Sequence, residues 1–308
     1  MVEVRGVAVE IETADALAEA VDVLVLKHAQ GSYGVDAAAK KRLELDPEME
    51  LPPGGVLEVP GRGRVGAETV LFLGVPRMPD FGYPEIRLLG RRAVSMVITE
   101  HPECRNLALT LHGVGFGLDE SACFDAELAG IVDALEGPTG SRLERISIVE
   151  MDAGRVERLR HHLQETLTGS VTPSSSTPVR ATASDHVFVA MPFSEPFEDN
   201  FHYAIEPAAH SSGLLCERID KQAFTGSIPE HLKERIRSAK LVVADLSEAN
   251  PNVYLEVGFA WGAGVPTVLL CRRADELKFD VQSERCILYS SIQDLEDQLA
   301  GELRQLVG

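Results

Sequence analysis

The chain has 308 residues, of which 44% are hydrophobic and 25% charged, so it is long enough for two ordinary domains and has the composition of a soluble globular protein. Its formal net charge of −19 argues against nucleic acid as the main partner, because that binding depends on clustered lysine and arginine. No segment approaches the roughly 18 to 20 apolar residues that span a bilayer and no secretory signal begins the chain, so we expect a cytoplasmic protein without membrane contact.

Five cysteines are scattered along the chain without CxxC spacing, which indicates neither a disulfide framework nor a zinc site. They are Cys104, Cys123, Cys216, Cys271 and Cys286. We expect them to be buried free thiols, and we expect no metal and no cofactor.

Strand-like apolar runs alternate with helical patterns in the first half of the chain. The expected strands are Val21–Lys27, Thr69–Val75, Leu107–His112 and Ile146–Glu150. The expected helices are Ile86–Glu100, Ser121–Glu136 and Ala153–Leu167. This alternation predicts an α/β domain over residues 1–168.

A run rich in serine, threonine and proline follows and predicts a linker over residues 169–184. The alternation then restarts and predicts a second α/β domain over residues 185–308. Its expected strands are His186–Ala190, Leu241–Leu246 and Thr267–Cys271, and its expected helices are Phe197–His210, Pro229–Ser238, Pro251–Ala263 and Ser291–Leu306.

One carboxylate, Glu256, lies within an otherwise apolar helix. The strand Leu241–Leu246 is an apolar run that contains Asp245, as expected of a strand buried on both faces of a parallel sheet, and ligands bind at the carboxyl ends of such strands. Asn250 suits a helix N-cap and Pro251 the first helical position. Glu256 is therefore expected near the start of the helix, close to that edge of the sheet.

Burying an unpaired carboxylate is costly, so Glu256 requires compensation. The helix N-terminus favours an anion, Asn252 lies four residues earlier on the same face, and a cleft open to ligand would serve equally well. A structural alternative is that Glu256 pairs with Arg218, or with another basic residue, as a buried brace. Small residues after Glu256 are expected to let the helix approach the sheet closely; they are Gly258, Ala260, Gly262, Ala263 and Gly264.

Four segments carry a resemblance to a known family: "HVFVAMPFSEPF", "GLLCERID", the long run from "IPEHLKERIRSAKLVVADLSEANPNVYLEVGFA" to "WGAGVPTVLL", and "KFDVQSERCILY". From His186 to Tyr289 they resemble, in order, the nucleoside 2-deoxyribosyltransferase-like family, which is similar in fold to TIR-type NAD glycohydrolases. The resemblance implies a flavodoxin-like parallel sheet and a carboxylate that attacks the anomeric carbon of a nucleoside or nucleotide.

The resemblance also implies site residues. The Glu of the family's Glu-x-Gly-x-Ala signature corresponds to Glu256, and the "AMPF" loop would lie against sugar or base; its residues are Ala190, Met191, Pro192 and Phe193. The usual acidic residue six positions before the nucleophile is here Asn250. Asp245 and Asp220 are the nearest substitutes as proton donor, each with the alternative of a plain turn or cap residue, and Arg218 could hold a phosphate or carboxylate.

This chemistry favours NAD or a related nucleotide. Breaking an N-glycosidic bond builds positive charge on the sugar, which an ionised carboxylate stabilises or bonds to. A purine or pyrimidine often needs a proton in order to leave, whereas the nicotinamide of NAD is already cationic. The substitution at Asn250 therefore favours NAD, or a nucleotide with another acid.

A glycine-rich loop lies between strand and helix in the first half, in "TLHGVGFGLDESACF". Its residues Gly113, Gly115, Phe116 and Gly117 let backbone N–H groups approach a phosphate, although a plain tight turn explains the same spacing. With "VDVLVLKHAQGSYG" and "GAETVLFLGV", the loop resembles the macro-type fold at the front of leucyl aminopeptidases, in which a similar Gly-aromatic-Gly loop cradles the phosphates of ADP-ribose. The resemblance implies a ligand sensor or a scaffold for assembly.

The leading hypothesis is an N-glycosidase effector that cleaves NAD or a related nucleotide with Glu256 and is regulated by the first domain. Such domain pairings resemble bacterial antiviral defence proteins, which is an analogy. One alternative is a metabolic nucleoside or nucleotide hydrolase or deoxyribosyltransferase; another is a non-catalytic nucleotide-sensing module. We expect a nucleotide substrate, a nucleotide signal at the first domain, and a homo-oligomer.

Overall fold

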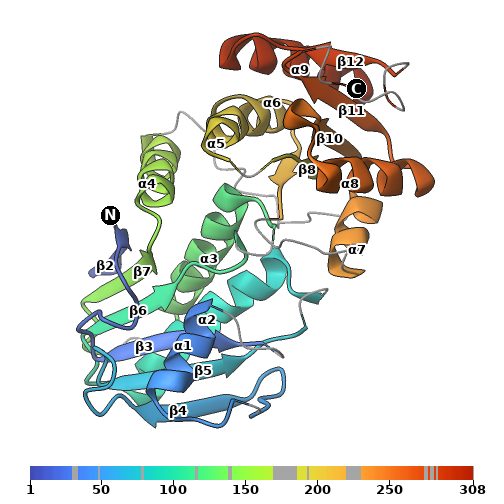
Figure 1. The fold of residues 1–308 in the computed structure, drawn as a ribbon. Helices are drawn as coiled ribbons and strands as arrows, with labels where there is room; N and C mark the ends of the chain where they lie inside the picture. The colour runs from blue at the N-terminus through green and yellow to red at the C-terminus, as the bar shows by residue number, and fades with distance from the viewer. Residues whose placement is uncertain are drawn as a thin grey trace. The chain divides into compact units, whose positions relative to one another are not determined.

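The computed structural model describes residues 1–29, 34–47, 49–77, 80–114, 117–137, 141–168, 186–192, 194–219, 230–273, 277, 281 and 284–307. By their contacts the residues form two compact units. The first unit is Met1–Val114 with Glu120–Val179, and the second is Gly115–Asp119 with Arg180–Gly308. Both are α/β, as predicted (Figure 1). The predicted linker lies outside the described residues.

The first unit contains a mixed sheet. Its strands are β1 (Val2–Val4), β2 (Val7–Thr13), β3 (Val23–His28), β4 (Val56–Pro60), β5 (Thr69–Gly74), β6 (Asn106–Thr110) and β7 (Arg145–Glu150). Its helices are α1 (Gly34–Arg42), α2 (Tyr83–Glu100), α3 (Glu120–Leu135) and α4 (Ala153–Thr168). The predicted strands and helices of this half all occur, with ends shifted by one or a few residues, whereas β1, β2, β4 and α1 were not predicted.

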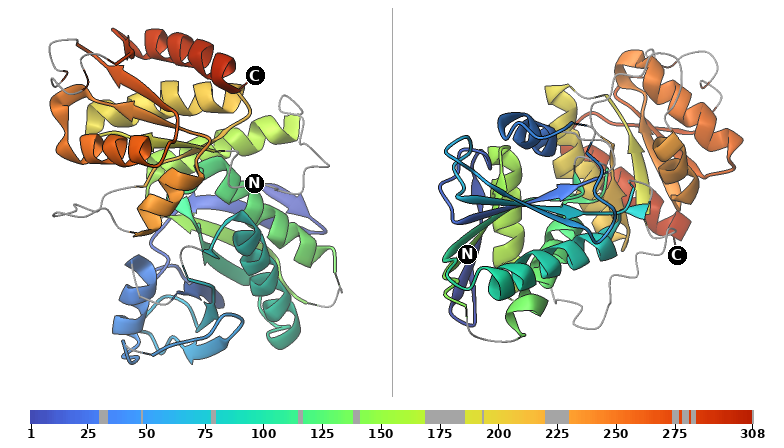
Figure 2. Two further views of the ribbon diagram at one scale, coloured as in Figure 1. Left: turned by 90° about the vertical axis from the view of Figure 1, so that its right-hand side faces the viewer. Right: turned by 90° about the horizontal axis from the view of Figure 1, so that it is seen from below.

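The burial of each strand explains which strands could be predicted from the sequence. Among the described residues the sheet order is β1-β2-β7-β6-β3-β5-β4, antiparallel only at β1–β2 and β4–β5. Every residue of the central strand β3 is buried, because helices cover both faces of the sheet, as the right-hand view of Figure 2 shows. The edge strand β4 alternates exposed and half-buried residues and has no continuous apolar run.

Helices α2 and α3 pack closely through two glycines. A Cβ at Gly90 would lie 2.7 Å from the carbonyl oxygen of Glu127, and a Cβ at Gly130 would overlap the carbonyl oxygen of Arg87. Glycine at each position therefore lets the backbones of the two helices approach one another.

The second unit contains a parallel sheet. Its strands are β8 (His186–Ala190), β9 (Leu215–Glu217), β10 (Leu241–Asp245), β11 (Thr267–Cys271) and β12 (Cys286–Leu288). Its helices are α5 (Glu195–Asn200), the π-helix η3 (Phe201–Ile205), α6 (Glu206–Ser211), α7 (Glu230–Ser238), the 3₁₀ turn η4 (Ser247–Ala249), α8 (Pro251–Gly262) and α9 (Ile292–Val307). The predicted helix 197–210 thus contains a π-helical segment.

The strand order confirms the flavodoxin-like prediction. In the described residues it is β12-β11-β10-β8-β9, with every pair parallel. In chain order this is the doubly wound pattern 2-1-3-4-5, whose direction of winding reverses between the first and third strands. The reversal lies between β8 and β10, so the crevice expected to receive ligand is at the carboxyl ends of those two strands.

The two faces of this sheet have different cores. Val187, Val243 and Leu270 pack with residues of α5, η3, α6 and α9, whereas Phe188 and Ala244 pack with residues of α7 and α8. Helix α8 buries Val253, Val257 and Ala260. The glycines of α8 are a correction to the sequence analysis: a Cβ at Gly258 or Gly262 would meet nothing within 4 Å, because these residues face outward.

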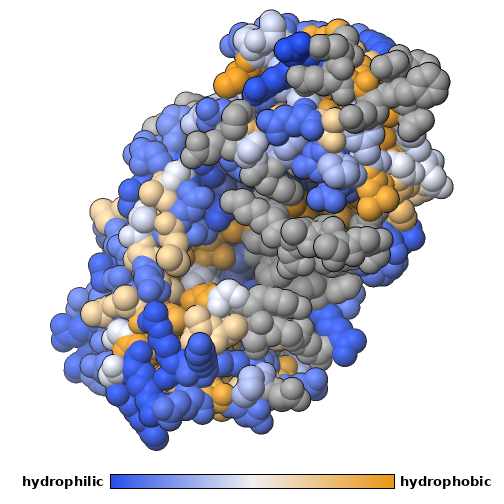
Figure 3. Space-filling model, in the orientation of Figure 1, coloured by the Kyte–Doolittle hydropathy of each residue, from blue (hydrophilic) through white to orange (hydrophobic). Residues whose placement is uncertain are grey.

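No helix in the described part of the chain is long and apolar enough to cross a membrane. The face shown in Figure 3 is mostly hydrophilic, with hydrophobic residues in small separate groups. The charged residues make up 25% of the sequence, which is ordinary for a globular domain.

Candidate functional site

Helix α8 begins directly after the carboxyl edge of β10, and Asn250 determines where it starts. The Asn250 side-chain oxygen accepts a hydrogen bond of 3.0 Å from the backbone N–H of Asn252, and Pro251 occupies the first turn. This is an ordinary N-cap, in which a side-chain oxygen satisfies a backbone donor that lacks a helical partner. The Asn250 side chain and the backbone N–H of Asn252 therefore start the helix that carries Glu256.

Glu256 is partly exposed on α8. Within the part of the chain that the structure describes, its carboxyl makes neither an ion pair nor a hydrogen bond. Burial raises its pKa from 4.5 to about 7, because loss of water disfavours the charged form and no partner compensates. An uncompensated carboxyl of this kind is the type of group that occurs at functional sites.

The backbone before α8 is strained. Glu248 has φ 60° and Ala249 φ 48°, so two consecutive residues with side chains adopt the left-handed region. Each such residue costs about 1 kcal/mol or more, and such strain concentrates at functional sites. The strained pair lies between the end of β10 and the start of α8, at the edge where ligand is expected.

Asp245 is the last residue of β10 and is fully buried. Its Oδ2 accepts a hydrogen bond of 2.6 Å from Tyr289 Oη, and Tyr289 belongs to the core on the α9 face. Burial raises the pKa of Asp245 most, while Ser247 and Tyr289 oppose the shift. Because α8 packs on the other face, Asp245 and Glu256 extend from opposite sides of the sheet.

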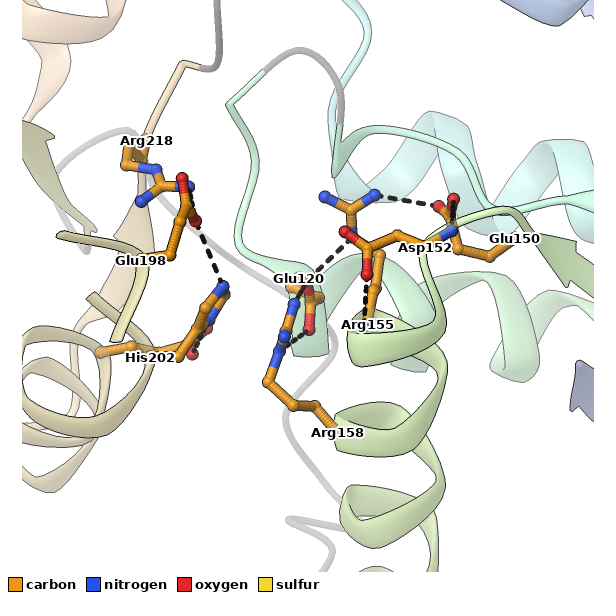
Figure 4. Close-up of polar contacts among 9 residues, drawn as sticks. Glu120, Glu150, Asp152, Arg155, Arg158, Glu198, His202 and Arg218 are labelled. Carbon is orange, nitrogen blue, oxygen red and sulfur yellow. Dashed lines mark hydrogen bonds and ion pairs between the residues drawn. The ribbon is translucent and has the colours of Figure 1, made fainter. Parts of the chain in front are cut away.

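Arg218 also lies on the α9 face. Its guanidinium is 2.8 Å from Glu198 and 4.1 Å from the centre of the Phe201 ring. Figure 4 shows Arg218 and Glu198 together, with His202 beyond them; His202 is 3.2 Å from Glu206. The sequence alternative in which Arg218 pairs with Glu256 as a brace therefore has no support in this geometry.

The "AMPF" loop is partly described. Ala190 and Met191 are buried, at 1% and 2% exposure, and Pro192 is also buried. Ala190 faces the α8 side and Met191 the α9 side. Phe193 lies outside the described residues, as does Asp220. The loop leaves β8 at the reversal point of the sheet, so its position fits a ligand-binding loop.

The glycine-rich loop of the first half follows β6. Gly113 has φ 95° and Gly117 φ 89°, which residues with a side chain rarely adopt. Gly115 and Phe116 lie outside the described residues. His112, just before Gly113, is held by Glu127 of α3, which is 2.8 Å from His112 Nδ1 and accepts a bond of 3.0 Å from its backbone N–H.

A buried polar cluster that was not predicted is formed by the end of β3 and helix α1. Lys27 and Asp36 form an ion pair of 2.6 Å, and His28 and Lys40 are 2% exposed. Burial lowers the pKa of His28 and of Lys40. Within the described ranges, His28 Nδ1 and Asp36 Oδ1 are buried without a hydrogen-bond partner. The signal in the sequence was Lys27–His28 directly after four apolar residues, at the carboxyl end of a central strand.

A second cluster in Figure 4 belongs to the first unit. Glu120, at the start of α3, lies 2.9 Å from both Arg155 and Arg158 of α4, and Arg155 also pairs with Glu150 at 3.0 Å. These contacts join α3 to α4. Because each of these charges has its opposite partner, we assign the cluster a structural role.

Among the described residues, one group could hold a metal ion: Asp119, Glu206 and His210, with ligand atoms within 4.8 Å of one another. By its contacts Asp119 belongs to the second unit. Its Oδ2 already lies 2.7 Å from His210 Nε2 and accepts a bond of 2.8 Å from the backbone N–H of Cys216. These partners account for the carboxylate, and we assign no metal to it.

No family model and no curated protein matches the chain. Solved structures that resemble it include the Oceanobacillus iheyensis macrodomain with ADP, which is 17% identical, covers 54% of this chain and 95% of its own, and has a TM-score of 0.44. The Trypanosoma brucei macrodomain in complex with ADP-ribose is 16% identical and covers 50% of this chain and 68% of its own, with a TM-score of 0.41. Each of these matches covers about half of this chain.

At this identity the likeness concerns the fold alone and carries no conclusion about what this chain binds. The comparisons give no support to the resemblance expected for residues 186–289 to deoxyribosyltransferases. That resemblance, and the roles it implies for Glu256 and the residues around it, stay predictions.

Proposed function

We propose that the second unit cleaves the bond between base and sugar in NAD or a related nucleotide, with Glu256 as the reacting carboxylate. The observation that carries the proposal is a largely desolvated carboxyl without a partner among the described residues. It lies on the helix that follows the strand at the reversal point of a doubly wound sheet. A structural carboxylate would have a compensating partner.

In the proposed reaction the ionised Glu256 attacks the anomeric carbon C1′. The C1′–N bond breaks and its electron pair leaves with the base, which for NAD converts the cationic nicotinamide ring into a neutral molecule. A glycosyl ester forms on Glu256, and water then attacks C1′, releases the sugar product and a proton, and restores the carboxylate. The atoms of the reaction balance, because one water molecule is consumed for each sugar product released.

The substrate preference follows from two described residues at the end of β10 and the start of α8, while Asp220, the other proposed proton donor, lies outside the described residues. Asn250 is an amide that caps α8, and Asp245 extends from the other face of the sheet, bonded to Tyr289. A base that needs protonation would therefore leave slowly. Nicotinamide needs no proton, so NAD fits the arrangement better than a purine nucleoside does.

The test is base release from NAD by the purified full chain, followed by chromatography. We expect the wild type to release nicotinamide and Glu256→Gln to lose at least about 100-fold in rate, because an amide is not a nucleophile here. Glu234→Gln, an exposed carboxylate of α7, is the matched control and should retain full activity.

The same assay separates the alternatives. Release of a base from nucleosides with transfer to a second base would favour a deoxyribosyltransferase or a metabolic hydrolase. Tight nucleotide binding without turnover would favour a non-catalytic sensor. No release from any nucleotide tested would end the enzymatic proposal. The role in antiviral defence remains an analogy.

We further propose that the first unit binds a nucleotide signal that regulates the second. The supporting observation is the cluster formed by the end of β3 and helix α1, in which His28 Nδ1 and Asp36 Oδ1 are buried and have no hydrogen-bond partner among the described residues. Buried polar atoms left unpaired are costly, and a ligand that bonds to them would remove this cost. Gly113, which follows β6 near the same sheet edge, has a positive φ. Glycine adopts this conformation readily, and it leaves the backbone there without a side chain.

ADP-ribose is the probe for this second proposal. Titration calorimetry on the full chain should show binding that Asp36→Asn weakens by about tenfold or more, since hydrogen bonds to charged groups contribute about 1.5–3 kcal/mol. Asp125→Asn, an exposed change on α3, should leave the affinity unchanged. If the wild type does not bind ADP-ribose, or if the control weakens binding equally, this regulatory role is wrong.

A further inference from the structure

A cavity of about 380 Å³ lies on the α9 side of the second unit. It is lined by Asp199 and Asn200 at the end of α5, by Arg272 after β11, and by Tyr289 and Ser290 after β12; Figure 1 shows these elements. The strands β11 and β12 end here, so the cavity is at the carboxyl edge of the sheet, where ligands of doubly wound folds bind. Its volume is that of a small-molecule site.

The buried side of the cavity is a fixed chain of hydrogen bonds. Asn200, which is 1% exposed, donates to Tyr289 Oη at 2.9 Å, and Tyr289 donates to Asp245 at 2.6 Å. Asp245 Oδ1 accepts from the backbone N–H of Ser247 at 3.0 Å. Asn200 is also the last residue before the π-helix η3, and π-helical turns occur frequently at functional sites.

Arg272 is positioned by its backbone and lies beside two aromatic rings. Its backbone N–H donates to Ser247 Oγ at 3.0 Å, and its guanidinium lies 5.1 Å from the centre of the Phe197 ring and 5.9 Å from that of Tyr289. Contacts between a guanidinium and aromatic faces fix the plane of its donors. Arg272 is exposed, and its guanidinium also lies 3.5 Å from Asn200 Oδ1, so the charge is accessible to an anion beside the buried hydrogen-bond chain.

Asp199 supplies the opposite charge at the rim. It is exposed, and among the described residues it has no hydrogen bond or ion pair. A guanidinium recognises phosphate through paired donors, and an ionised carboxylate accepts hydrogen bonds from hydroxyl groups such as those of ribose. The cavity therefore offers complementary groups for a sugar that carries a phosphate.

We propose that this cavity binds the ribose–phosphate portion of a nucleotide, with Arg272 on the phosphate and Asp199 on the ribose hydroxyls. The site is separate from the proposed reaction at Glu256, because α8 packs on the opposite face of the sheet. It goes beyond that proposal and does not depend on it. A second nucleotide is the ligand class that fits.

The test is calorimetric titration of the full chain with ribose 5-phosphate and, separately, with inorganic phosphate. The wild type should bind ribose 5-phosphate more tightly. Arg272→Gln should weaken binding by about tenfold or more, as expected for a charge-assisted bond to phosphate, and Arg272→Lys should lose less. Asp199→Asn should reduce the preference for ribose 5-phosphate over inorganic phosphate.

Arg273→Gln is the matched control, because it removes the same charge from the adjacent exposed residue, and it should bind like the wild type. Glu256→Gln should also bind normally even if it abolishes base release, which separates the two proposals. Equal affinity for the two probes, equal weakening in Arg273→Gln, or a loss found in Asp36→Asn instead of Arg272→Gln would overturn the site. Thermal unfolding midpoints identify any variant that fails to fold.

Discussion

Glu256→Gln is expected to remove base release and, at pH 8, to increase the free energy of unfolding of the second unit by about 1–3 kcal/mol. A substitution that abolishes activity while it stabilises the fold is the signature of a residue kept for function at a cost in stability. Substitution of a structural carboxylate would have the opposite effect on stability.

The sign follows from the direction of the pKa shift. Burial raises the pKa of Glu256 from 4.5 to about 7, so between these values the folded chain binds a proton that the unfolded chain releases. Stability therefore falls as pH rises from about 4.5 through 7, where the folded carboxyl must ionise. Glutamine has no charge to bury. Wild type and variant should differ little near pH 4.5 and most above pH 7.

Urea unfolding at pH 5 and pH 8 measures this difference, with Glu234→Gln as the exposed control. The activity should carry the same pKa: because the proposed nucleophile is the ionised form, kcat/KM for nicotinamide release should increase as pH rises through about 7. If Glu256→Gln destabilised the unit at pH 8, the carboxylate would have a stabilising partner and the reacting role would be wrong.

The parts of the fold that were predicted are those with strong local signals. The strands around Leu24 and Val243 are apolar on both faces, and such runs are visible without any knowledge of the fold. The edge strand Val56–Pro60 is half exposed. It forms because it pairs with β5, and this pairing cannot be read from the residues of the strand itself. The π-helical turn Phe201–Ile205 depends on how one extra residue is accommodated in a continuous helix, which periodicity does not reveal.

The sequence predicted the central residue of the candidate site, but it did not predict which residues lie beside that residue. Glu256 was noticeable as a charge among apolar residues. Asp245 and Arg218 were expected beside it, and both belong to the other face of the sheet. Because Val242 and Val243 are equally apolar, the strand gave no indication of which face each neighbouring residue occupies. The face that each residue occupies depends on which connecting helices cover which face of the sheet, and this is a property of the whole unit.

The α2–α3 contact gives the second large effect: Gly130→Ala should lower the free energy of unfolding of the first unit by about 1–3 kcal/mol, as overpacking does. A Cβ there would overlap the carbonyl oxygen of Arg87 and lie 2.9 Å from the backbone nitrogen of Arg91. Both atoms belong to the backbone of α2, so the helices must separate to admit a methyl group.

Gly258→Ala is the matched control, the same change within the exposed surface of α8. A Cβ at Gly258 meets nothing within 4 Å, so alanine should stabilise the second unit by about 0.5–1 kcal/mol through helix propensity alone. Urea unfolding of the two variants should therefore give shifts of opposite sign. A gain in stability for Gly130→Ala would mean that α2 and α3 do not touch at this glycine, because propensity would then act without a steric cost.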